Sequence, residues 1–456
     1  MTPSTEESPL RSTSNESSYP RATYAWYVVG VLAFVYVFSF LDRTILNLLV
    51  GPIRRDLAIT DTQMSLLIGF AFALFYVAFG IPLGRLADSR SRRGLITAGF
   101  ALWSFFTAGC GLAGNYAQLL VMRMGVGVGE ASLGPAAYSL ITDYFPPRRR
   151  GLAMGIYHVG VYAGVGIAFL VGGLVTALVA RQPAWDLPIL GTVRSWQMVF
   201  IVIGFAGLVS VPVMATVREP RRREARAEAV PLSEVLAHYK KNGSAFLCLH
   251  LSFALLALSG YGAAAWMPSF FIRHHHWTAA QFGLVNGLIL TFGGSLAACL
   301  SGLVADRLAA RGRRDAFYLV AAVGASLWSL FGTAQLLAPN GTLAAILFAP
   351  AASFYATQTG MGPAALMQIT PARMRGQAGA IYLFVLGVIG AGLGPTAVAL
   401  CTDYIFHNDD MVGYSILLVA MSSSGLAALL LWFGRNAFVG SQDRMVETPV
   451  ALAATQ

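Results

Sequence analysis

The stretch from Pro146 to Tyr157, PPRRRGLAMGIY, returns 225 residues later as PARMRGQAGAIY, from Pro371 to Tyr382. Proline, the Arg-Gly pair, alanine and the final Ile-Tyr coincide in the two copies. A second repeat, GRLAD at 84–88 and GLVAD at 302–306, recurs at a shift of 218, and an arginine cluster follows each copy. Two motif pairs at nearly one shift predict a chain built as two similar, parallel halves.

The composition around these repeats indicates a membrane protein. Of the 456 residues, 56% are hydrophobic and only 11% are charged, whereas a soluble domain carries about 25% charged residues. A span of hydrocarbon needs about 20 apolar residues. We therefore predict an all-α integral membrane fold with twelve transmembrane helices in two six-helix halves. The predicted spans are 25–50, 62–86, 94–114, 117–142, 151–180, 196–216, 245–272, 279–304, 316–337, 342–367, 377–402 and 412–434.

The domain layout follows from these spans. We expect a disordered cytoplasmic tail at 1–23, a six-helix bundle at 24–216, a cytoplasmic linker at 217–244, a second bundle at 245–435 and a cytoplasmic tail at 436–456. With both termini in the cytoplasm, 24 of the 31 Lys and Arg residues fall on the cytoplasmic side and five on the other. Cytoplasmic loops attract basic residues, so this bias supports the orientation. It also explains the net charge of +10 without a nucleic-acid partner.

Charged side chains (Asp, Glu, Lys and Arg) inside the spans are few, and the four that are clearly embedded lie in the first half. They are Asp42, Arg43, Arg123 and Glu130. Such groups cost at least about 2.5 kcal/mol at the centre of a bilayer, which makes them candidates for function. Arg123 and Glu130 are seven residues apart, about two helical turns, and so share one helix face.

We interpret Asp42 and Glu130 as proton-coupling residues that alternate between an arginine-paired and a protonated state. Arg123 and Arg43 would hold an anionic head group of the substrate. The alternative is a buried salt-bridge network that only keeps the helices in register. The sequence leaves both interpretations open.

Two groups of motifs resemble a known family. The doubled Gly-x-x-x-Asp loop with its arginines, at 84–93 and 302–314, is similar to the signature of the major facilitator superfamily. Leu41-Asp42-Arg43 and the run from Arg123 to Ser132 resemble the spinster branch, whose members carry lysolipids and sphingosine phosphates. The loop departs from the common pattern by having Ser91 where many members have glycine.

The resemblance implies a latch between the halves, with Asp88 and Asp306 at its centre, and helix N-termini attract such carboxylates. Simple orientation of the loops by their arginines is the alternative. The expected latch residues are Gly84, Asp88, Arg92, Arg93, Asp306, Arg150 and Arg375.

The second half lacks a clearly embedded charge, and its candidate cavity residues are neutral or aromatic. The expected substrate-binding residues are Arg43, Arg123, Tyr157, Tyr261, Trp266, Tyr355, Gln358 and Tyr382, with Asn286, Met361 and Met367 as further candidates. Ordinary packing is the alternative for each of the neutral residues. A cavity with one charged wall and one apolar wall would suit an amphiphile with an anionic head group.

The sequence therefore predicts a secondary active transporter that works by alternating access, is coupled to protons, and carries an amphipathic lipid-like anion or zwitterion. A proton-coupled organic-anion symporter or a drug efflux antiporter of the same fold is the alternative. The sequence has no cluster of a nucleophile and a base that would indicate an enzyme, and we expect no cofactor or metal. We expect a monomer in a bilayer. The 29 arginines against two lysines favour a GC-rich bacterial source, hence a cytoplasmic (inner) membrane.

Overall fold

The computed structural model describes residues 19–188, 191–220, 222 and 230–453, and within them twelve spans cross the membrane. In the described residues nine helical segments are long and apolar enough to qualify alone, and α5 and the broken pairs α6–α7 and α15–α16 complete the twelve. The first bundle consists of α1 (Ala22–Leu48), α2 (Val50–Leu57), α3 (Asp61–Ser65), η2 (Leu66–Phe70), α4 (Ala71–Ser89), α5 (Arg92–Cys110), α6 (Tyr116–Glu130), α7 (Leu133–Tyr144), α8 (Pro147–Val179) and α9 (Ser195–Ala215).

The linker contributes one helix, α10 (Leu232–Lys241), before the second bundle begins. That bundle consists of α11 (Gly243–Arg273), α12 (Ala279–Leu288), η3 (Ile289–Gly294), α13 (Ser295–Ala310), α14 (Ala316–Leu336), α15 (Gly341–Ala356), α16 (Gln358–Gln368), η4 (Ala372–Met374), α17 (Arg375–Leu386), η5 (Gly387–Leu393), α18 (Gly394–Leu400), η6 (Cys401–Phe406), η7 (Asp409–Met411), α19 (Val412–Ile416), η8 (Leu417–Met421) and α20 (Ser422–Ala453).

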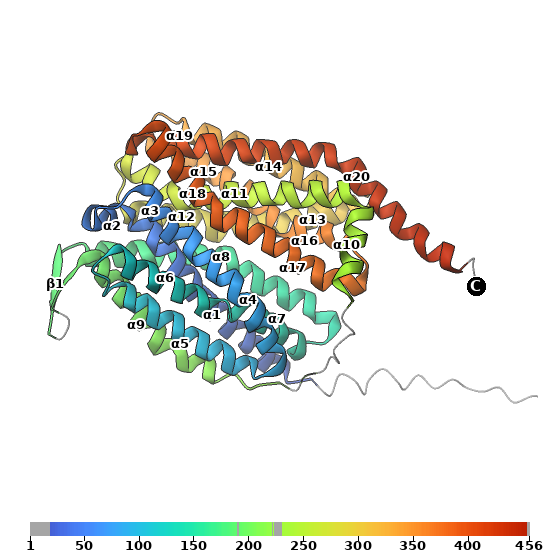
Figure 1. Cartoon of the computed structure of the whole chain (residues 1–456), viewed down its shortest axis with the longest axis horizontal. Coiled ribbons are helices and arrows are strands. Elements are labelled where there is room, and N and C mark those ends of the chain that lie inside the picture. The colour runs from blue at the N-terminus through green and yellow to red at the C-terminus, as the bar shows by residue number, and fades with distance from the viewer. Residues whose placement is uncertain (1–18, 189–190, 221, 223–229, 454–456) are drawn as a thin grey trace, which may run out of the picture.

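The two bundles lie side by side with their helices along the long axis of the molecule (Figure 1). An antiparallel hairpin of β1 (Ala184–Leu187) and β2 (Gly191–Arg194) projects at one end, together with α2 and α19. We call this the hairpin end, and the opposite one, where α20 leaves the bundle, the terminal end.

Matching helix caps support the two-half organisation. The second and eighth spans both begin with a capping box, from Thr60 with Gln63 and from Thr278 with Gln281. The fourth and tenth spans both begin at an asparagine, Asn115 and Asn340, whose side chain accepts from a backbone N–H three residues on. These caps recur at shifts of 218 and 225, the shifts of the two sequence repeats. Since each cap satisfies N–H groups that the first helical turn leaves unpaired, both halves start these spans in the same way.

Glycines allow the bundles to touch toward the hairpin end. A Cβ atom on Gly166 of α8 would lie 2.6 Å from the carbonyl oxygen of Gly287 in α12. A Cβ atom on Gly69 of η2 would lie equally close to the carbonyl oxygen of Ala391 in η5. Any side chain at these positions would push the helices apart, so the contact depends on small residues.

The described chain differs from the expected layout at its C-terminal end. Helix α20 continues to Ala453, well past the expected end of the last span at 434. Phe438 and Ser441 are buried, and Asp443 forms an ion pair with Arg314 of the loop between α13 and α14. The segment expected as a tail from 436 is thus helical as far as Ala453. The expected tail at 1–23 lies outside the described residues up to position 18.

Candidate functional site

A cavity of about 480 Å³ lies between the two bundles. Helices α1, α7 and α8 line it from one side, and α11, α12, α14, α15, α16 and α17 from the other. No Asp, Glu, Lys, Arg or His is among the described residues of this wall, whose polar members are amides and hydroxyls such as Asn286, Gln358 and Thr359. The wall includes six tyrosines, namely Tyr36, Tyr138, Tyr162, Tyr261, Tyr355 and Tyr382.

Four of the expected substrate-binding residues line this cavity: Tyr261, Tyr355, Gln358 and Tyr382. Trp266 does not, because its ring is buried and its Nε1–H donates to the carbonyl oxygen of Pro395 at 2.8 Å. Tyr157 lies behind the wall, with its ring stacked parallel to that of Tyr36 at 5.2 Å between centroids. Both residues therefore lie outside the cavity wall.

The first-bundle part of the aromatic wall was not anticipated from the sequence. Tyr36 and Phe40 are four residues apart on α1, so they face the cavity together. Tyr162 of α8 makes a hydroxyl–hydroxyl hydrogen bond with Thr359 of α16, across the boundary between the bundles. The signal that could have identified Tyr162 is its position in a glycine-rich span. The small neighbouring residues there offer few partners against which a large side chain can pack.

The buried charges form a compact group directly behind this wall. Glu130 Oε2 accepts hydrogen bonds from Ser39 Oγ and Arg43 Nε, both at 2.7 Å, and lies 2.5 Å from Arg43 Nη2. The Arg43 guanidinium lies over the ring of Phe72 at 4.5 Å and 5.8 Å from the ring of Phe40. Because Phe40 is part of the wall, the charge on Arg43 is one aromatic layer away from the cavity.

Arg123 and Asp42 meet through the backbone. Arg123 Nη1 donates to the carbonyl oxygen of Asp42 at 3.1 Å, and its Nε donates to that of Leu67 at 3.4 Å. Within the described residues, Arg123 Nη2 and Glu130 Oε1 are buried without a hydrogen-bond partner. An unpaired buried polar group costs about 1–3 kcal/mol, and more when it is charged. In the described part of the chain, the cluster therefore holds one unpaired donor, on Arg123, and one unpaired acceptor, on Glu130.

None of the four embedded charges lines the cavity in this conformation. Asp42, Arg123 and Glu130 are at most 2% exposed, and the Arg43 side chain retains 26% exposure. The structure thus brings the four residues together beside the cavity, and Arg43 and Arg123, which were expected to bind the substrate, are not part of its wall. Contact of Arg123 with a substrate would require a side-chain movement, whereas part of the Arg43 side chain is already exposed.

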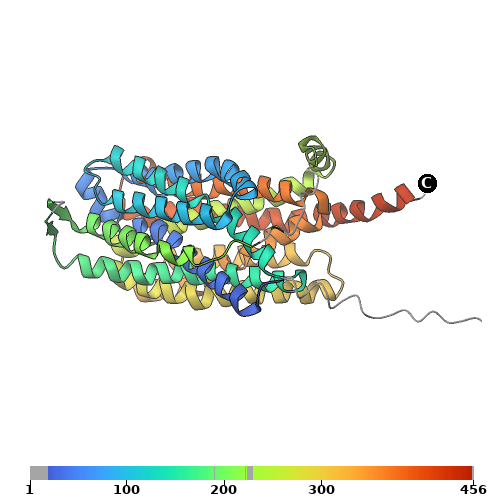
Figure 2. The same cartoon turned by 90° about the horizontal axis from the view of Figure 1, so that it is seen from below.

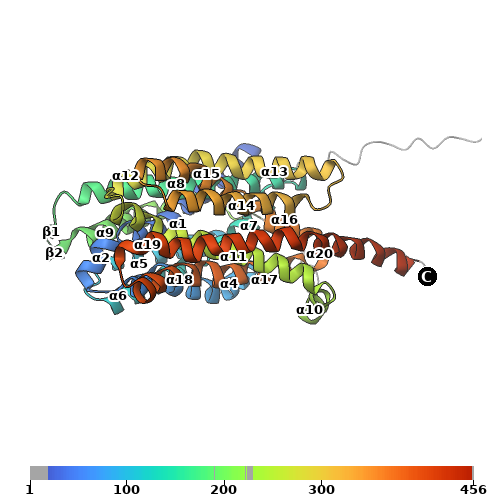
Figure 3. The same cartoon turned by 90° about the horizontal axis from the view of Figure 1, so that it is seen from above.

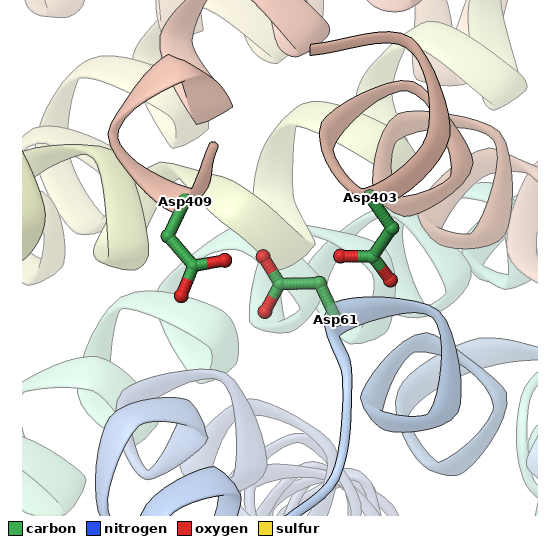
Figure 4. Close-up of side chains that lie close together, drawn as sticks. All are labelled: Asp61, Asp403 and Asp409. Carbon is green, nitrogen blue, oxygen red and sulfur yellow. The ribbon is translucent and has the colours of Figure 1, made fainter. Parts of the chain in front are cut away.

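A second group of charges joins the two bundles at the hairpin end (Figure 4). Asp61 is fully buried and pairs with Arg273 of the other bundle through two contacts of 2.7 and 2.8 Å. Arg54 lies 3.0 Å from Asp61 and 2.6 Å from Asp409. Asp403 accepts from both the backbone N–H and the hydroxyl of Thr62 at 2.6 Å.

The three carboxylates of this group, Asp61, Asp403 and Asp409, lie close enough to one another to suggest a cation site. Their oxygens, however, already accept hydrogen bonds from Arg54, Arg273 and Thr62. Two guanidinium groups also balance much of the negative charge. We therefore interpret the group as a set of ion pairs that holds the bundles together at this end.

The loop between the second and third spans is held within its own bundle. Arg92 is buried and pairs with Asp143 of α7 and, at 2.8 Å, with Glu219 at the start of the linker. Glu219 also accepts from Ser91 Oγ and from the backbone N–H of Arg93, each at 2.8 Å. Burial alone would raise the pKa of Glu219, but these hydrogen bonds outweigh it and hold that pKa below its ordinary value.

The other expected latch residues have separate surroundings. Arg150 and Arg375, at equivalent places in the repeat, each donate to the backbone carbonyl five residues before them, in Phe145 and Thr370. Asp306 is exposed on α13. Gly84 lies beside Pro135, and the side chain of Asp88 is outside the described part of the chain. A latch between the halves remains a prediction.

Two six-helix bundles around a membrane-embedded cavity, with ion pairs joining them at one end, are the arrangement of a membrane solute transporter. The family model described as Major Facilitator Superfamily matches residues 32–395, and the chain belongs to this superfamily. Its members transport solutes rather than catalyse reactions, so the chain is a multi-pass transport protein and not an enzyme.

Three individual proteins are similar to this chain over different shares of its length. An "MFS-type efflux pump" of Mycolicibacterium smegmatis is 27% identical over 90% of this chain and 92% of its own length. Protein spinster homolog 1 of Homo sapiens is 28% identical over 54% of this chain, and the match spans 46% of that protein. A crystal structure of a bacterial homolog of the human lysosomal transporter Spinster, inward-facing and occupied, has a TM-score of 0.74 and 25% identity, covering 93% of this chain and 98% of the other.

Proposed function

We propose that this protein is a proton-coupled secondary transporter of an amphipathic, lipid-like anion or zwitterion. The observation that carries the proposal is the placement of Asp42, Arg43, Arg123 and Glu130 as a buried cluster against an aromatic cavity between the bundles. The cavity would hold the solute, and the cluster would exchange a proton as the two bundles rock.

The chemistry of the cavity wall favours an amphiphile. Six tyrosines and several phenylalanines offer apolar surface with scattered hydroxyls, while the described wall residues hold no fixed cation. A small organic anion would be left without a charged partner there, which costs several kcal/mol for a desolvated carboxylate. An apolar tail can instead fill the wall, and a head group can approach Arg43 past Phe40.

An apolar groove on the outer surface points in the same direction. It has a volume of about 180 Å³ between α4 and the α17–η5 segment, on the seam where the bundles meet. All its lining residues are apolar or glycine, and they include Leu74, Val77 and Val388. Such a seam suits a hydrocarbon chain that enters from the bilayer better than a hydrated sugar.

Coupling would follow from the geometry of Glu130. As a carboxylate it attracts Arg43 and accepts from Ser39, and one of its oxygens lacks a partner among the described residues. Protonation removes the charge that holds the guanidinium, which frees Arg43 to turn toward the cavity and an anionic head group. Asp42 lies beside Arg123 and is the principal titrating group in this proposal.

We further propose that the protein resides in a bacterial cytoplasmic membrane with both termini in the cytoplasm. The excess of arginine on loops of the terminal end supports this orientation. The hairpin end would then face outward. The ion pairs of Asp61, Arg54 and Arg273 would close the outward path in this conformation.

Drug efflux is the second candidate, favoured by the full-length match to the mycobacterial efflux pump. A thermal-shift screen of detergent-purified protein separates the candidates, with lysolipids, sphingoid phosphates, organic acids and lipophilic drugs tested at several pH values. We expect stabilisation by a single-chain lipid with a charged head, because binding to the folded state raises its stability. Stabilisation by neutral or cationic drugs alone would support efflux, and stabilisation by short organic acids alone would contradict the cavity argument.

A further inference from the structure

The linker helix α10 lies across the direction of the spans. In Figure 1 it runs crosswise at the terminal end, while the membrane helices run along the page. Figures 2 and 3 look nearly along its axis and show it outside the outline of the bundle. A helix with this orientation, at the level where the spans end, lies in the plane of the membrane surface.

Several contacts fix α10 at this position. Val235 is fully buried, and His238 Nε2 lies 2.8 Å from the carbonyl oxygen of Ile369. The Tyr239 ring stacks on that of Phe246, the fourth residue of α11. A single residue, Asn242, separates α10 from α11, and its buried side chain donates to His238 and accepts from Arg444. The corner is therefore rigid.

The remaining surface of α10 is amphipathic. Leu232 and Leu236 are 56% and 54% exposed and share one face, being four residues apart. With 3.6 residues per turn, Glu234 and Lys241 point to the opposite side, and Lys240 lies between the two faces. Two exposed leucines on a well-anchored helix need an apolar environment that the described protein does not supply.

That environment is continuous with the lipid-facing surface of the neighbouring span. Leu247 and Leu251 of α11 are 65% and 40% exposed and follow directly from the corner at Asn242. Lys240 and Lys241 are exposed, and the nearby Arg373 keeps a largely exposed side chain while pairing with Glu234 at 3.2 Å. Basic residues beside an apolar helix face are complementary to anionic lipid head groups.

We propose that α10 is a membrane-surface helix that inserts Leu232 and Leu236 into the leaflet on the terminal side and binds anionic phospholipid head groups through Lys240 and Lys241. The bilayer thus contacts the linker between the bundles as well as the spans. This interaction is independent of the cargo and of proton coupling.

The insertion is tested by nitroxide labels on the full-length protein in liposomes of phosphatidylcholine and phosphatidylglycerol. Cys248 and Cys299, the cysteines that are not buried, are first replaced by alanine. A label at position 236 should collide with oxygen more than with a water-soluble nickel chelate, and the matched label at Ala237 should show the reverse preference. Equal exposure of both labels to the nickel chelate would overturn the proposal, as would shielding of position 236 from both reagents, which indicates a protein partner.

The charge contribution is tested with K240E/K241E. Each lysine near an anionic surface should favour partition toward it about fivefold. The label at position 236 should therefore shift toward the nickel chelate in liposomes that contain phosphatidylglycerol, with no such shift in pure phosphatidylcholine. Folding of the variant is checked by an unchanged elution profile. An identical shift in both lipids, or none in either, would contradict the role of the lysines.

Discussion

Replacing Arg273 by alanine should open the hairpin end. Asp61 is fully buried and holds two contacts to Arg273 and one, of 3.0 Å, to Arg54. Loss of one partner of a buried pair costs about 3–5 kcal/mol when the remaining charge is uncompensated. Because Arg54 stays in place and still compensates Asp61, we expect about half of this cost, or about 2 kcal/mol. At 1.4 kcal/mol per factor of ten, this lowers the ratio of closed to open molecules about 30-fold. A closed-to-open ratio of 99:1 would become about 3:1.

Spin labels at Arg55 and Asp410, which are exposed on the two bundles near this cluster, report the opening through their distance distribution. The Arg273→Ala variant should gain a population with a longer distance. The matched control is Arg313→Ala, which removes the pair of the exposed Arg313 with Asp315, within one bundle and at the other end. A distance distribution in Arg273→Ala that equals the wild type would refute the view that these ion pairs hold the bundles together.

Three further predictions concern the bundle contact, the loop clamp and a helix cap. Gly166→Val should abolish transport without loss of membrane-inserted protein, because a Cβ atom at this position meets the backbone of the other bundle. The control is Gly30→Val, which should transport like the wild type because nothing lies within 4 Å of a Cβ atom there. Equal transport activity of the two variants would contradict the role of Gly166 in the contact between the bundles. The pKa of Glu219 is lowered in the folded state, so its contribution is complete above the ordinary value and is lost as pH falls through the lowered one. Hydrogen exchange of the loop between the second and third spans, which Glu219 holds, should therefore rise only when the pH falls below the ordinary pKa of a glutamate. In the Glu219→Gln variant this exchange should already be faster at neutral pH. Asn340→Ala removes an N-cap and should lower the free energy of unfolding by about 1 kcal/mol, measured by thermal denaturation, and no change would mean that the cap is redundant.

The sequence alone was sufficient to predict features that depend on the cost of burying charged or polar groups in the membrane. Asp42 and Glu130 stood out because few charges occur within the spans, and the structure places them in one cluster with Arg43 and Arg123. The twelve spans followed from apolar length, and the repeats gave the two halves. The wall of the second bundle was anticipated at Tyr261, Tyr355, Gln358 and Tyr382, because polar and aromatic groups in a span need a reason to be there.

The ion pairs at the hairpin end could not be predicted in the same way. Arg54, Asp61 and Arg273 sit at the ends of spans, where a charge is indistinguishable in sequence from a solvated loop residue. Asp61 and Arg273 are 212 positions apart, and only the packing of one bundle on the other brings them together. Trp266 shows the converse, since a tryptophan in a span reads equally well as a ligand-binding or a packing residue, and its hydrogen bond to Pro395 makes it the latter.

The central claim is that the buried carboxylates couple proton movement to transport, and Asp42→Asn in proteoliposomes tests it most directly. The measurement is uptake of the solute that the binding screen identifies, driven by an imposed pH gradient, beside counterflow exchange, which requires no net proton movement. Since asparagine keeps the shape and removes the titratable proton, we predict that gradient-driven uptake is lost and counterflow is retained. Gradient-driven uptake at the wild-type rate would contradict the account.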